Sequence, residues 1–399
     1  MAKMGPGIDK NKIRWIYQDG FCDTENLCVI LFDIMPLQII HEKVSAGTSA
    51  EHSENAPGHV LVFMFQGVSK RRSHIVAYYF IEGSIEPMLL AETIKEVVHA
   101  VMKTTYTVLA VVCNHSSLNV TTMELLSQTN NHTLACCSFK FRGRTIFIVY
   151  DVPQLYLSIR NYFHESGEIV LDEKTARWSH LIEVINYFKG EPYCFLSIME
   201  DDINLTEESK KDVQLAIATL SHKTAVSLRL LSEHGHRKMN KDINDMNVYM
   251  DSAVVIAQLD SLLSCTSGPQ SKYEYQSGYK EWVHKHSFHY KKWAEYIQKL
   301  KTVRFPTADN DLKLRSKRCI DCYINTLQSF RRIWKYLSGK SVKSLSLERL
   351  NQNKLQRMFK LITKKVCTKQ LTSKDFTTAL QTVEKQIEKN RRQNSCLLT

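Results

Sequence analysis

The sequence lacks the long apolar segments that mark membrane proteins. It has no uninterrupted apolar stretch of about 18 residues, the usual minimum for a helix that crosses a bilayer. Its start, from Met1 to Arg14, lacks the apolar core of a secretory signal. A Walker-type glycine loop is also missing, so the pattern predicts no phosphate cradle. We therefore expect a soluble intracellular protein that does not use a membrane.

The sequence also lacks a disulfide framework and a zinc-binding pattern. The 11 cysteines are odd in number and include the adjacent Cys136 and Cys137, which favours reduced thiols. The C-x-x-C motif of Cys319 and Cys322 has no second pair and no histidine at ligand spacing nearby. We interpret this motif as one face of a helix and expect no metal site there.

Acidic residues are fewer than basic ones. The chain has 41 Asp and Glu against 53 Lys and Arg, which gives a formal charge of +12 and a pI near 9.0. This charge suits an anionic partner, with nucleic acid the first candidate, although solvated basic helix faces would give the same count. The candidate nucleic-acid-binding residues are Lys70, Arg71, Arg72, Lys317, Arg318, Arg331, Arg332, Lys364 and Lys365. Their contacts to a DNA backbone would be weak, sequence-tolerant and salt-dependent.

One short stretch, Leu27 to Met35, is the starting point for predicting the fold. It is almost continuously apolar and rich in β-branched residues, which predicts a strand covered on both faces at the centre of a mixed or parallel sheet. Asp33 is the one carboxylate in this stretch. Buried carboxylates are rare unless they are paired or bind a metal, so Asp33 marks a possible site. The alternative is an acid at the solvated rim of the strand.

The elements that follow predict an α/β fold of the ribonuclease-H-like class. After the first strand come a hairpin, a helix, a strand, a second helix and a last strand, at residues 59–66 with 74–81, 86–103, 106–113, 118–128 and 144–150. The crossover through the first helix should make the strand at 106–113 parallel to its partner. Asn114 then lies at the carboxyl end of that strand, where open α/β sheets place ligand-binding residues.

A large all-α insertion is predicted to interrupt this mixed sheet. From Pro153 to about Lys340 strand signals nearly vanish, and apolar residues recur three and four apart. The predicted helices span 175–188, 207–233, 245–263, 280–301 and 312–337. The predicted domains are an N-terminal segment at 1–26, the first part of the core at 27–165, the helical insertion at 166–340, and a final core helix with a basic tail at 341–399.

Several separated motifs occur in one order along the chain. They are Leu31 to Met35, His59 to Phe65 with Tyr79 and Phe80, Val112 to Asn114, Asp151 to Leu155 with Ile159 to Asn161, Lys211 to Leu231, and Asn351 to Phe359. In order and spacing these motifs resemble the P-element family of DNA transposases, which includes vertebrate relatives with an N-terminal THAP zinc finger. The resemblance spans roughly Ile13 to Lys365.

The resemblance implies an Asp-Asp-Glu catalytic set on a ribonuclease-H-like core, with Mg²⁺ at the site and GTP bound by the insertion. The first catalytic Asp falls on Asp33, the second on Asn114 and the Glu on Gln356, with Asn353 in place of a further Asp. Two Mg²⁺ ions need anionic oxygens, whereas an amide offers only a neutral carbonyl oxygen. We therefore expect a degenerate site that holds no metal, unless a neighbouring acid such as Glu124 or Glu348 serves instead.

These observations predict a catalytically inactive, transposase-derived nuclear protein that lacks the THAP finger. We expect it to bind the DNA backbone, an unidentified protein partner or both, and homo-oligomers are possible. We expect no cofactor, and the sequence leaves open whether GTP is still bound. The alternatives are an active metal-dependent DNA transposase and a protein scaffold without affinity for nucleic acid.

Overall fold

The computed structural model describes residues 6–18, 26–37, 58–68, 72–128, 137–189, 196–235, 239, 246–268, 282–340, 342–366 and 372–396. The chain divides into two compact units. Unit 1 contains Met1–His132, Phe139–Ile146 and Gln352–Thr399. Unit 2 contains Thr133–Ser138 and Phe147–Asn351.

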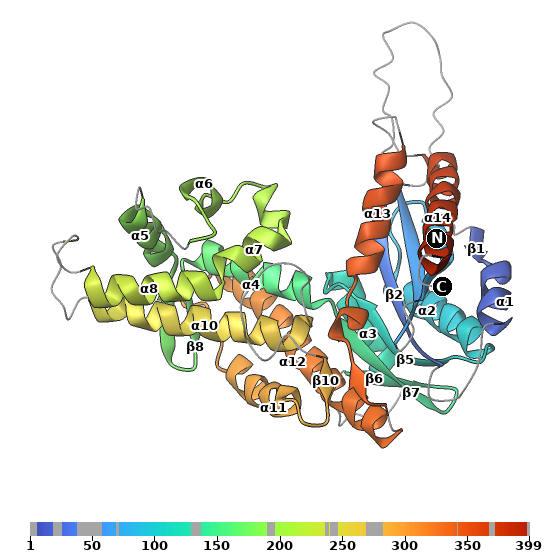
Figure 1. Ribbon diagram of the computed structural model, residues 1–399, viewed down its shortest axis with the longest axis horizontal. Coiled ribbons are helices and arrows are strands. Elements are labelled where there is room, and N and C mark those ends of the chain that lie inside the picture. The colour runs from blue at the N-terminus through green and yellow to red at the C-terminus, as the bar shows by residue number, and fades with distance from the viewer. Residues whose placement is uncertain are drawn as a thin grey trace, which may run out of the picture. The chain divides into compact units, whose positions relative to one another are not determined.

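A mixed seven-stranded sheet has the strand order β1-β4-β3-β2-β5-β7-β6 (Figure 1), and it belongs to unit 1 except for Ser138 of β6 and residues 147–150 of β7. The strands are β1 (Pro6–Ile8), β2 (Leu27–Pro36), β3 (His59–Gly67), β4 (Ser73–Ile81), β5 (Thr107–Cys113), β6 (Ser138–Phe141) and β7 (Arg144–Tyr150). The strand predicted to be central, β2, is the fourth of the seven. All its residues from Leu27 to Asp33 are buried, which explains why its sequence shows no polar alternation.

The register of β2 confirms the predicted crossover. β2 is antiparallel to β3 and parallel to β5, with Leu27 opposite Thr107 and Leu31 opposite Val112. The helix between the parallel strands, α2 (Pro87–Met102), buries an apolar stripe that includes Leu90, Ile94, Val97 and Val101. Parallel neighbours bring their carboxyl ends to the same edge of the sheet, and this places Asn114 beside Asp33.

The N-terminal segment, predicted as residues 1–26 and assigned no helix or strand, contains two elements of the core. β1 pairs antiparallel with β4, and α1 (Lys10–Gln18) contacts β4. The prediction missed them because a three-residue strand and a nine-residue helix are too short to show a clear period.

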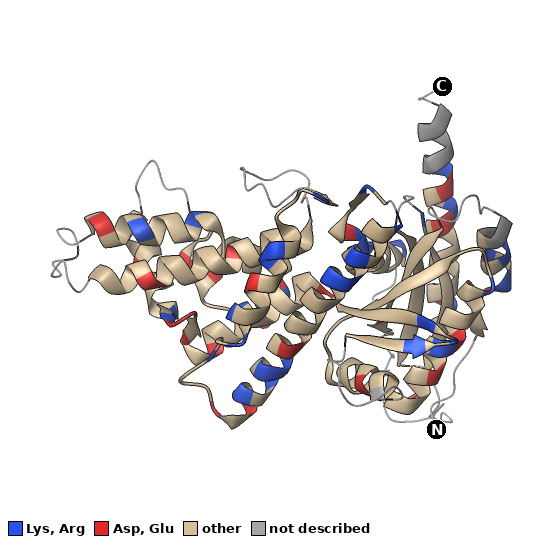
Figure 2. Ribbon diagram, turned by 90° about the horizontal axis from the view of Figure 1, so that it is seen from below, with Lys and Arg blue, Asp and Glu red and all other residues tan. Residues whose placement is uncertain are grey.

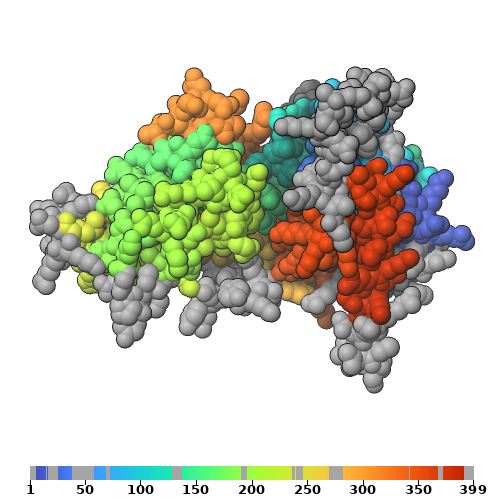
Figure 3. Space-filling model, turned by 90° about the horizontal axis from the view of Figure 1, so that it is seen from above, coloured from blue at the N-terminus to red at the C-terminus, as the bar shows by residue number. Residues whose placement is uncertain are grey.

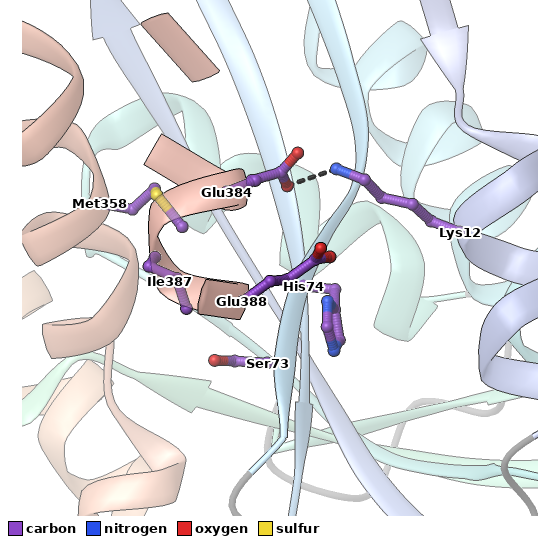
Figure 4. Close-up of a pocket in the computed structure, with 7 residues that line it drawn as sticks. All are labelled: Lys12, Ser73, His74, Met358, Glu384, Ile387 and Glu388. Atoms are coloured by element: carbon purple, nitrogen blue, oxygen red, sulfur yellow. Dashed lines mark hydrogen bonds and ion pairs between the residues drawn. The ribbon is translucent and has the colours of Figure 1, made fainter. Parts of the chain in front are cut away.

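Two C-terminal helices complete unit 1, which also contains α3 (Ser117–Gln128). α13 (Asn353–Lys365) contacts β2 and α14 (Ser373–Cys396), and Figure 3 shows α13 and α14 side by side on the surface. The Phe376 ring of α14 packs on the rings of Tyr78 and Phe80 in β4. Farther along α14, Glu384 forms an ion pair with Lys12 of α1 beside a small cavity of about 80 Å³ (Figure 4). The first and last helices of unit 1 are thus joined over β4.

Unit 2 is mainly helical, which confirms the predicted insertion. Its elements are α4 (Val152–Ser166), β8 (Glu168–Leu171), β9 (Lys174–Arg177), α5 (Trp178–Phe188), α6 (Glu200–Ile203), η1 (Ser209–Lys211), α7 (Val213–Thr219), α8 (His222–His234), α10 (Asn247–Ser267), β10 (Val283–His284), α11 (His289–Leu300), α12 (Asn310–Gly339), β11 (Ser344–Leu345) and η3 (Leu347–Leu350). By its contacts with α7, α10 and α12, α4 belongs to this unit, so the compact unit starts before residue 166.

The helix predicted over 175–188 is partly wrong, because its first residues form β9. β8 and β9 are an antiparallel hairpin whose two turn residues, Asp172 and Glu173, have φ values of 53° and 65°. A two-residue turn with both φ values positive matches the twist of a hairpin. Strands of four residues are too short for the alternation of a strand to outweigh the helical spacing of α5.

α10 is the one helix in the described residues that is long and apolar enough, by length and composition, to cross a membrane. Its most apolar window has a mean hydropathy of 1.2, and 56% of that window is buried within the protein. α10 contacts α8, β9 and α4, so it is a core helix of unit 2.

Candidate active site

Asp33 lies near the carboxyl end of β2 and is 7% exposed. Its Oδ1 accepts a hydrogen bond of 2.8 Å from the backbone N–H of Ile34. The alternative of an acid at a solvated rim is therefore wrong. A buried carboxylate needs hydrogen-bond donors or a cation, and the neighbouring elements supply donors.

Asn114 follows the last residue of β5 and provides the second donor. Its Nδ2 donates to Oδ1 of Asp33 at 2.8 Å. Its Oδ1 accepts two further hydrogen bonds, from the backbone N–H of Ser116 at 3.0 Å and from Nδ2 of Asn119 at 2.8 Å. Because a carboxylate only accepts, this orientation of the Asn114 amide is the one that satisfies both of its ends.

α13 provides the third donor, in its first turn. Nε2 of Gln356 donates to Oδ2 of Asp33 at 2.5 Å. Just before the helix, the fully buried Gln352 donates from Nε2 to the backbone carbonyl of Phe32 at 2.6 Å. Two glutamines one turn apart therefore attach α13 to β2. Asn353, the first residue of the helix, has an exposed side chain.

The sequence interpretation does not single out Gln352 of this site or the residue that follows Asn114. Gln352 is named only as part of the motif from Asn351 to Phe359. The one sequence feature that could have indicated it is its spacing of four residues from Gln356, which places both on one face of a helix. His115 directly follows Asn114, and burial lowers its pKa to about 4. His115 is therefore a neutral imidazole at pH 7.

Burial dominates the electrostatics of Asp33. It raises the pKa of this carboxyl to about 6, and the hydrogen bonds from Ile34 and Gln356 oppose the rise. At pH 7 Asp33 is mainly ionised, and its charge is offset by N–H dipoles from β2, the end of β5 and α13. The site is thus a carboxylate held by two side-chain amides and one backbone N–H.

These residues do not fit a site for two Mg²⁺ ions. Magnesium takes anionic or carbonyl oxygens, but Asn114 and Gln356 direct their N–H groups at Asp33. The amide oxygen of Asn114 already accepts two hydrogen bonds. No group of three or more His, Cys, Asp or Glu that could hold a metal occurs among the described residues, and Glu124 is exposed on α3.

The predicted nucleic-acid-binding residues occur in both units. Lys70 and Arg71 lie outside the described residues. In unit 1, Arg72 is partly buried, and Lys364 and Lys365 are exposed in the last turn of α13. In unit 2, the basic residues of α12 form two groups along the helix, as Figure 2 shows.

The two groups on α12 differ in their surroundings. Lys317 and Arg318 are exposed in its first half. Arg331 and Arg332 are partly buried, and the Arg331 guanidinium lies 4.7 Å from the centre of the Tyr290 ring. A cation stacked on an aromatic ring is already engaged within the protein, so Arg331 is a weaker candidate for DNA contact.

The motif around residues 151–161 positions α4 and the segment after α6. Asp151 is the N-cap of α4 and accepts a hydrogen bond from the backbone N–H of Gln154. The buried Arg160 donates from Nη2 to the carbonyls of Ser209 and Asp212, at 2.8 and 3.3 Å. These contacts give the motif a structural role. On α12, Cys319 and Cys322 are both buried, and Sγ of Cys319 points at the carbonyl of Leu155.

A mixed sheet with a carboxylate on its central strand and a late helix that reaches this carboxylate defines a ribonuclease-H-like core. Residues 5–127 match the family model described as a TNP-like, RNase H N-terminal domain, and residues 155–247 match the TNP-like, GTP-binding insertion domain. The chain belongs to the P-element-type transposase family, as its motifs predicted.

Two known proteins show how far the similarity extends. The chain is 24% identical over 213 residues to the Transposable element P transposase of Drosophila melanogaster, a match that covers 53% of this chain and 27% of that protein. The chain thus spans about a quarter of this relative's length. It is similar to the solved Drosophila P element transposase strand transfer complex with a TM-score of 0.75 and 18% identity, over 95% of this chain and 81% of that one. This likeness confirms the predicted fold.

Proposed function

We propose that this protein is a transposase-derived, nuclear DNA-binding protein without strand-cleavage activity. The observation that carries the proposal is the pair of hydrogen bonds from the amides of Asn114 and Gln356 to the carboxylate of Asp33. Metal-dependent strand cleavage needs several anionic ligands around two ions, and here a single carboxylate is bound by N–H groups.

The amides give the site a structural role, because their hydrogen bonds to Asp33 connect three elements of the core. The carboxylate of Asp33 joins β2, the end of β5 and α13 through hydrogen bonds to a charged group. Such bonds contribute about 1.5–3 kcal/mol each to stability. Three carboxylates in the same place would repel one another without metal, whereas this arrangement needs no ion.

Charge supports the DNA-binding part of the proposal. The chain carries a formal charge of +12, and exposed Lys and Arg residues occur on α12 and α13. The name of the solved relative describes a strand transfer complex, which is consistent with DNA as the partner. Binding through such residues should be weak and sequence-tolerant, with Kd roughly 10⁻⁴ to 10⁻⁶ M at physiological salt.

A strand-cleavage assay tests the proposal directly. The purified chain is incubated with DNA that carries the family's terminal repeats, in Mg²⁺ and separately in Mn²⁺, beside the Asp33→Ala variant. We expect neither protein to nick or join DNA above background. Cleavage by wild type that Asp33→Ala abolishes would instead support an active transposase with substitute ligands.

A binding titration at several salt concentrations separates the remaining alternatives. We expect measurable affinity for arbitrary duplex sequences that falls steeply as salt rises. No affinity even at low salt would favour a scaffold that acts only through protein partners. Tight, salt-insensitive binding of one sequence would contradict backbone recognition.

A further inference from the structure

Unit 2 contains a groove beside the first half of α12. It is formed by the loop after α11 and by one stripe of α12, and its volume is about 520 Å³. The groove residues on α12 recur at helical spacing, at Lys313, Lys317, Ile320, Asp321 and Ile324. A volume in this range suits a ligand of nucleotide size.

The rim of the groove is strongly basic. Lys301 and Arg304 come from the loop, and Lys313 and Lys317 come from successive turns of α12. All four are exposed, and none of them forms an ion pair within the described part of the chain. Arg315, on the same helix but outside the groove, pairs with Glu165 and Asp311. Lys301 donates a hydrogen bond to Oε1 of Gln298, and the charge of Lys317 acts to lower the pKa of Asp321, one turn farther along α12. Because neither contact is an ion pair, the groove cations can still bind an anion from outside.

The wall of the groove is apolar below this rim. Its accessible apolar surface comes from the half-buried Val303 and Ile324 and the exposed Pro306. Leu300, Phe305 and Ile320 also line the groove but are buried. Asp321 is the single carboxylate of the lining, and burial raises its pKa. An apolar wall with cations above it suits a ligand that combines a flat, weakly polar ring with anionic groups, and a nucleotide unit of a strand has both.

The arrangement of the cations favours a strand over a free nucleoside triphosphate. Binding of a triphosphate usually relies on backbone N–H groups converging at a glycine loop or a helix N-terminus. The α12 stripe starts at Lys313, the fourth residue of the helix, whose backbone N–H already donates to the carbonyl of the N-cap Asp309. Lys313 and Lys317 instead lie one turn apart along the helix. This spacing suits the phosphates of a nucleic-acid strand, which carry one charge each and repeat along the strand.

We propose that this groove binds a single strand of nucleic acid. Its phosphates lie against Lys301, Arg304, Lys313 and Lys317, and a base packs on the apolar wall. The proposal rests on the proposed DNA-binding function and adds to it a defined site and the single-stranded form of the partner. A base can lay its face on this apolar wall only where it is not stacked in a duplex.

The test compares two double variants of the full chain by fluorescence anisotropy. Lys313→Gln with Lys317→Gln removes two charges from the groove. Lys291→Gln with Lys343→Gln removes two exposed charges outside it. The probes are a labelled single-stranded oligonucleotide of about 12 nucleotides, its duplex, and a labelled GTP analogue. Circular dichroism melts check that both variants fold as wild type does.

We expect the groove variant to bind the single strand about tenfold more weakly at moderate salt, because two phosphate contacts are lost. The slope of log Kobs against log salt should become shallower by about 1.4, since each phosphate contact on a single strand contributes about 0.7. The outside variant should change both quantities much less, and the duplex should bind wild type more weakly than the single strand.

Equal losses in the two variants, or a preference for the duplex, would overturn the groove proposal and leave general DNA binding intact. Loss of GTP-analogue binding in the groove variant, with unchanged single-strand binding, would assign the groove to a free nucleotide and also overturn it. If wild type binds no nucleic acid at any salt, the proposed function itself fails.

Discussion

Nε2 of Gln356 donates a hydrogen bond of 2.5 Å to Oδ2 of Asp33, from a position 323 residues away in the sequence. This bond and the one from Asn114 close the site around one carboxylate. The N–H dipoles of these two amides stabilise the negative charge of Asp33 without a metal ion.

Introducing two acids should create a metal site. We expect Asn114→Asp with Gln356→Glu to be less stable than wild type in EDTA, because three carboxylates then repel one another. Millimolar Mn²⁺ should reverse the loss, since an ion that binds only the folded state adds about 2.7 kcal/mol at a hundredfold excess over its Kd. Thermal melts with and without the metal measure both effects.

The matched control is Gln381→Glu with Asn390→Asp, which adds the same charge at exposed positions of α14. This control and wild type should respond little to Mn²⁺. Equal metal responses in all three proteins would mean that residues 33, 114 and 356 do not form one ion site.

Gln356→Met should loosen α13. Methionine keeps the length of the side chain but removes the hydrogen bond to a buried carboxylate, so the free energy of unfolding should fall by about 1.5–3 kcal/mol. Urea denaturation measures the change, and Gln381→Met at an exposed position should change stability by less than about 0.5 kcal/mol. A loss at position 356 no larger than at position 381 would show that the bond contributes little.

Asp33 should make stability depend on pH with a defined sign. Its pKa is about 6 in the folded protein, against 3.8 for an aspartate in water, so between these values the folded state binds more protons than the unfolded state. The contribution of Asp33 to the free energy of unfolding is then largest near pH 4 and is lost as pH rises through 6, by about 3 kcal/mol in total.

The difference in stability between wild type and Asp33→Asn, measured by urea denaturation from pH 4 to 7, isolates this effect. As pH rises, wild type should lose stability relative to Asp33→Asn, and the difference should become constant above the folded pKa of Asp33. A flat difference would mean that burial does not raise the pKa of Asp33.

Phe376→Ala should detach α14 from β4. The Phe376 ring is fully buried between Tyr78 and Phe80, and truncating such a ring costs about 3–5 kcal/mol. Because α14 follows every other described element in the chain, we expect its local release before global unfolding, visible as faster proteolysis after the lysines of α14. Phe288→Ala, at a residue 66% exposed, is the control and should cleave at the wild-type rate.

The parts of the fold with long periodic patterns could be predicted from the sequence. β2 shows a run of apolar residues, and α12 repeats its apolar residues from Leu312 to Leu337, so both are predictable. β1 and the β8–β9 hairpin are not, because strands of three or four residues carry almost no alternation. Their pairing partners, and not their own sequences, determine their structure.

The candidate site was predictable to a similar extent. Asp33 stands out as a carboxylate in an apolar run, and the parallel crossover places Asn114 beside it. Gln356 could be assigned only through family resemblance, because no local pattern indicates a contact across 323 residues. The bond from Gln352 to the Phe32 carbonyl depends on the final position of α13 and has no signal beyond its glutamine neighbour.

The two amides on Asp33 also have an evolutionary consequence. A lineage in which only one of them is replaced by an acid acquires a second buried carboxylate beside the first, with too few ligands to hold a pair of ions. That intermediate loses a hydrogen bond and gains repulsion, so selection for stability would remove it before a second replacement arrives. The hydrogen-bonded arrangement therefore resists change, because any stepwise path from two amides to three acids passes through proteins that fold less well.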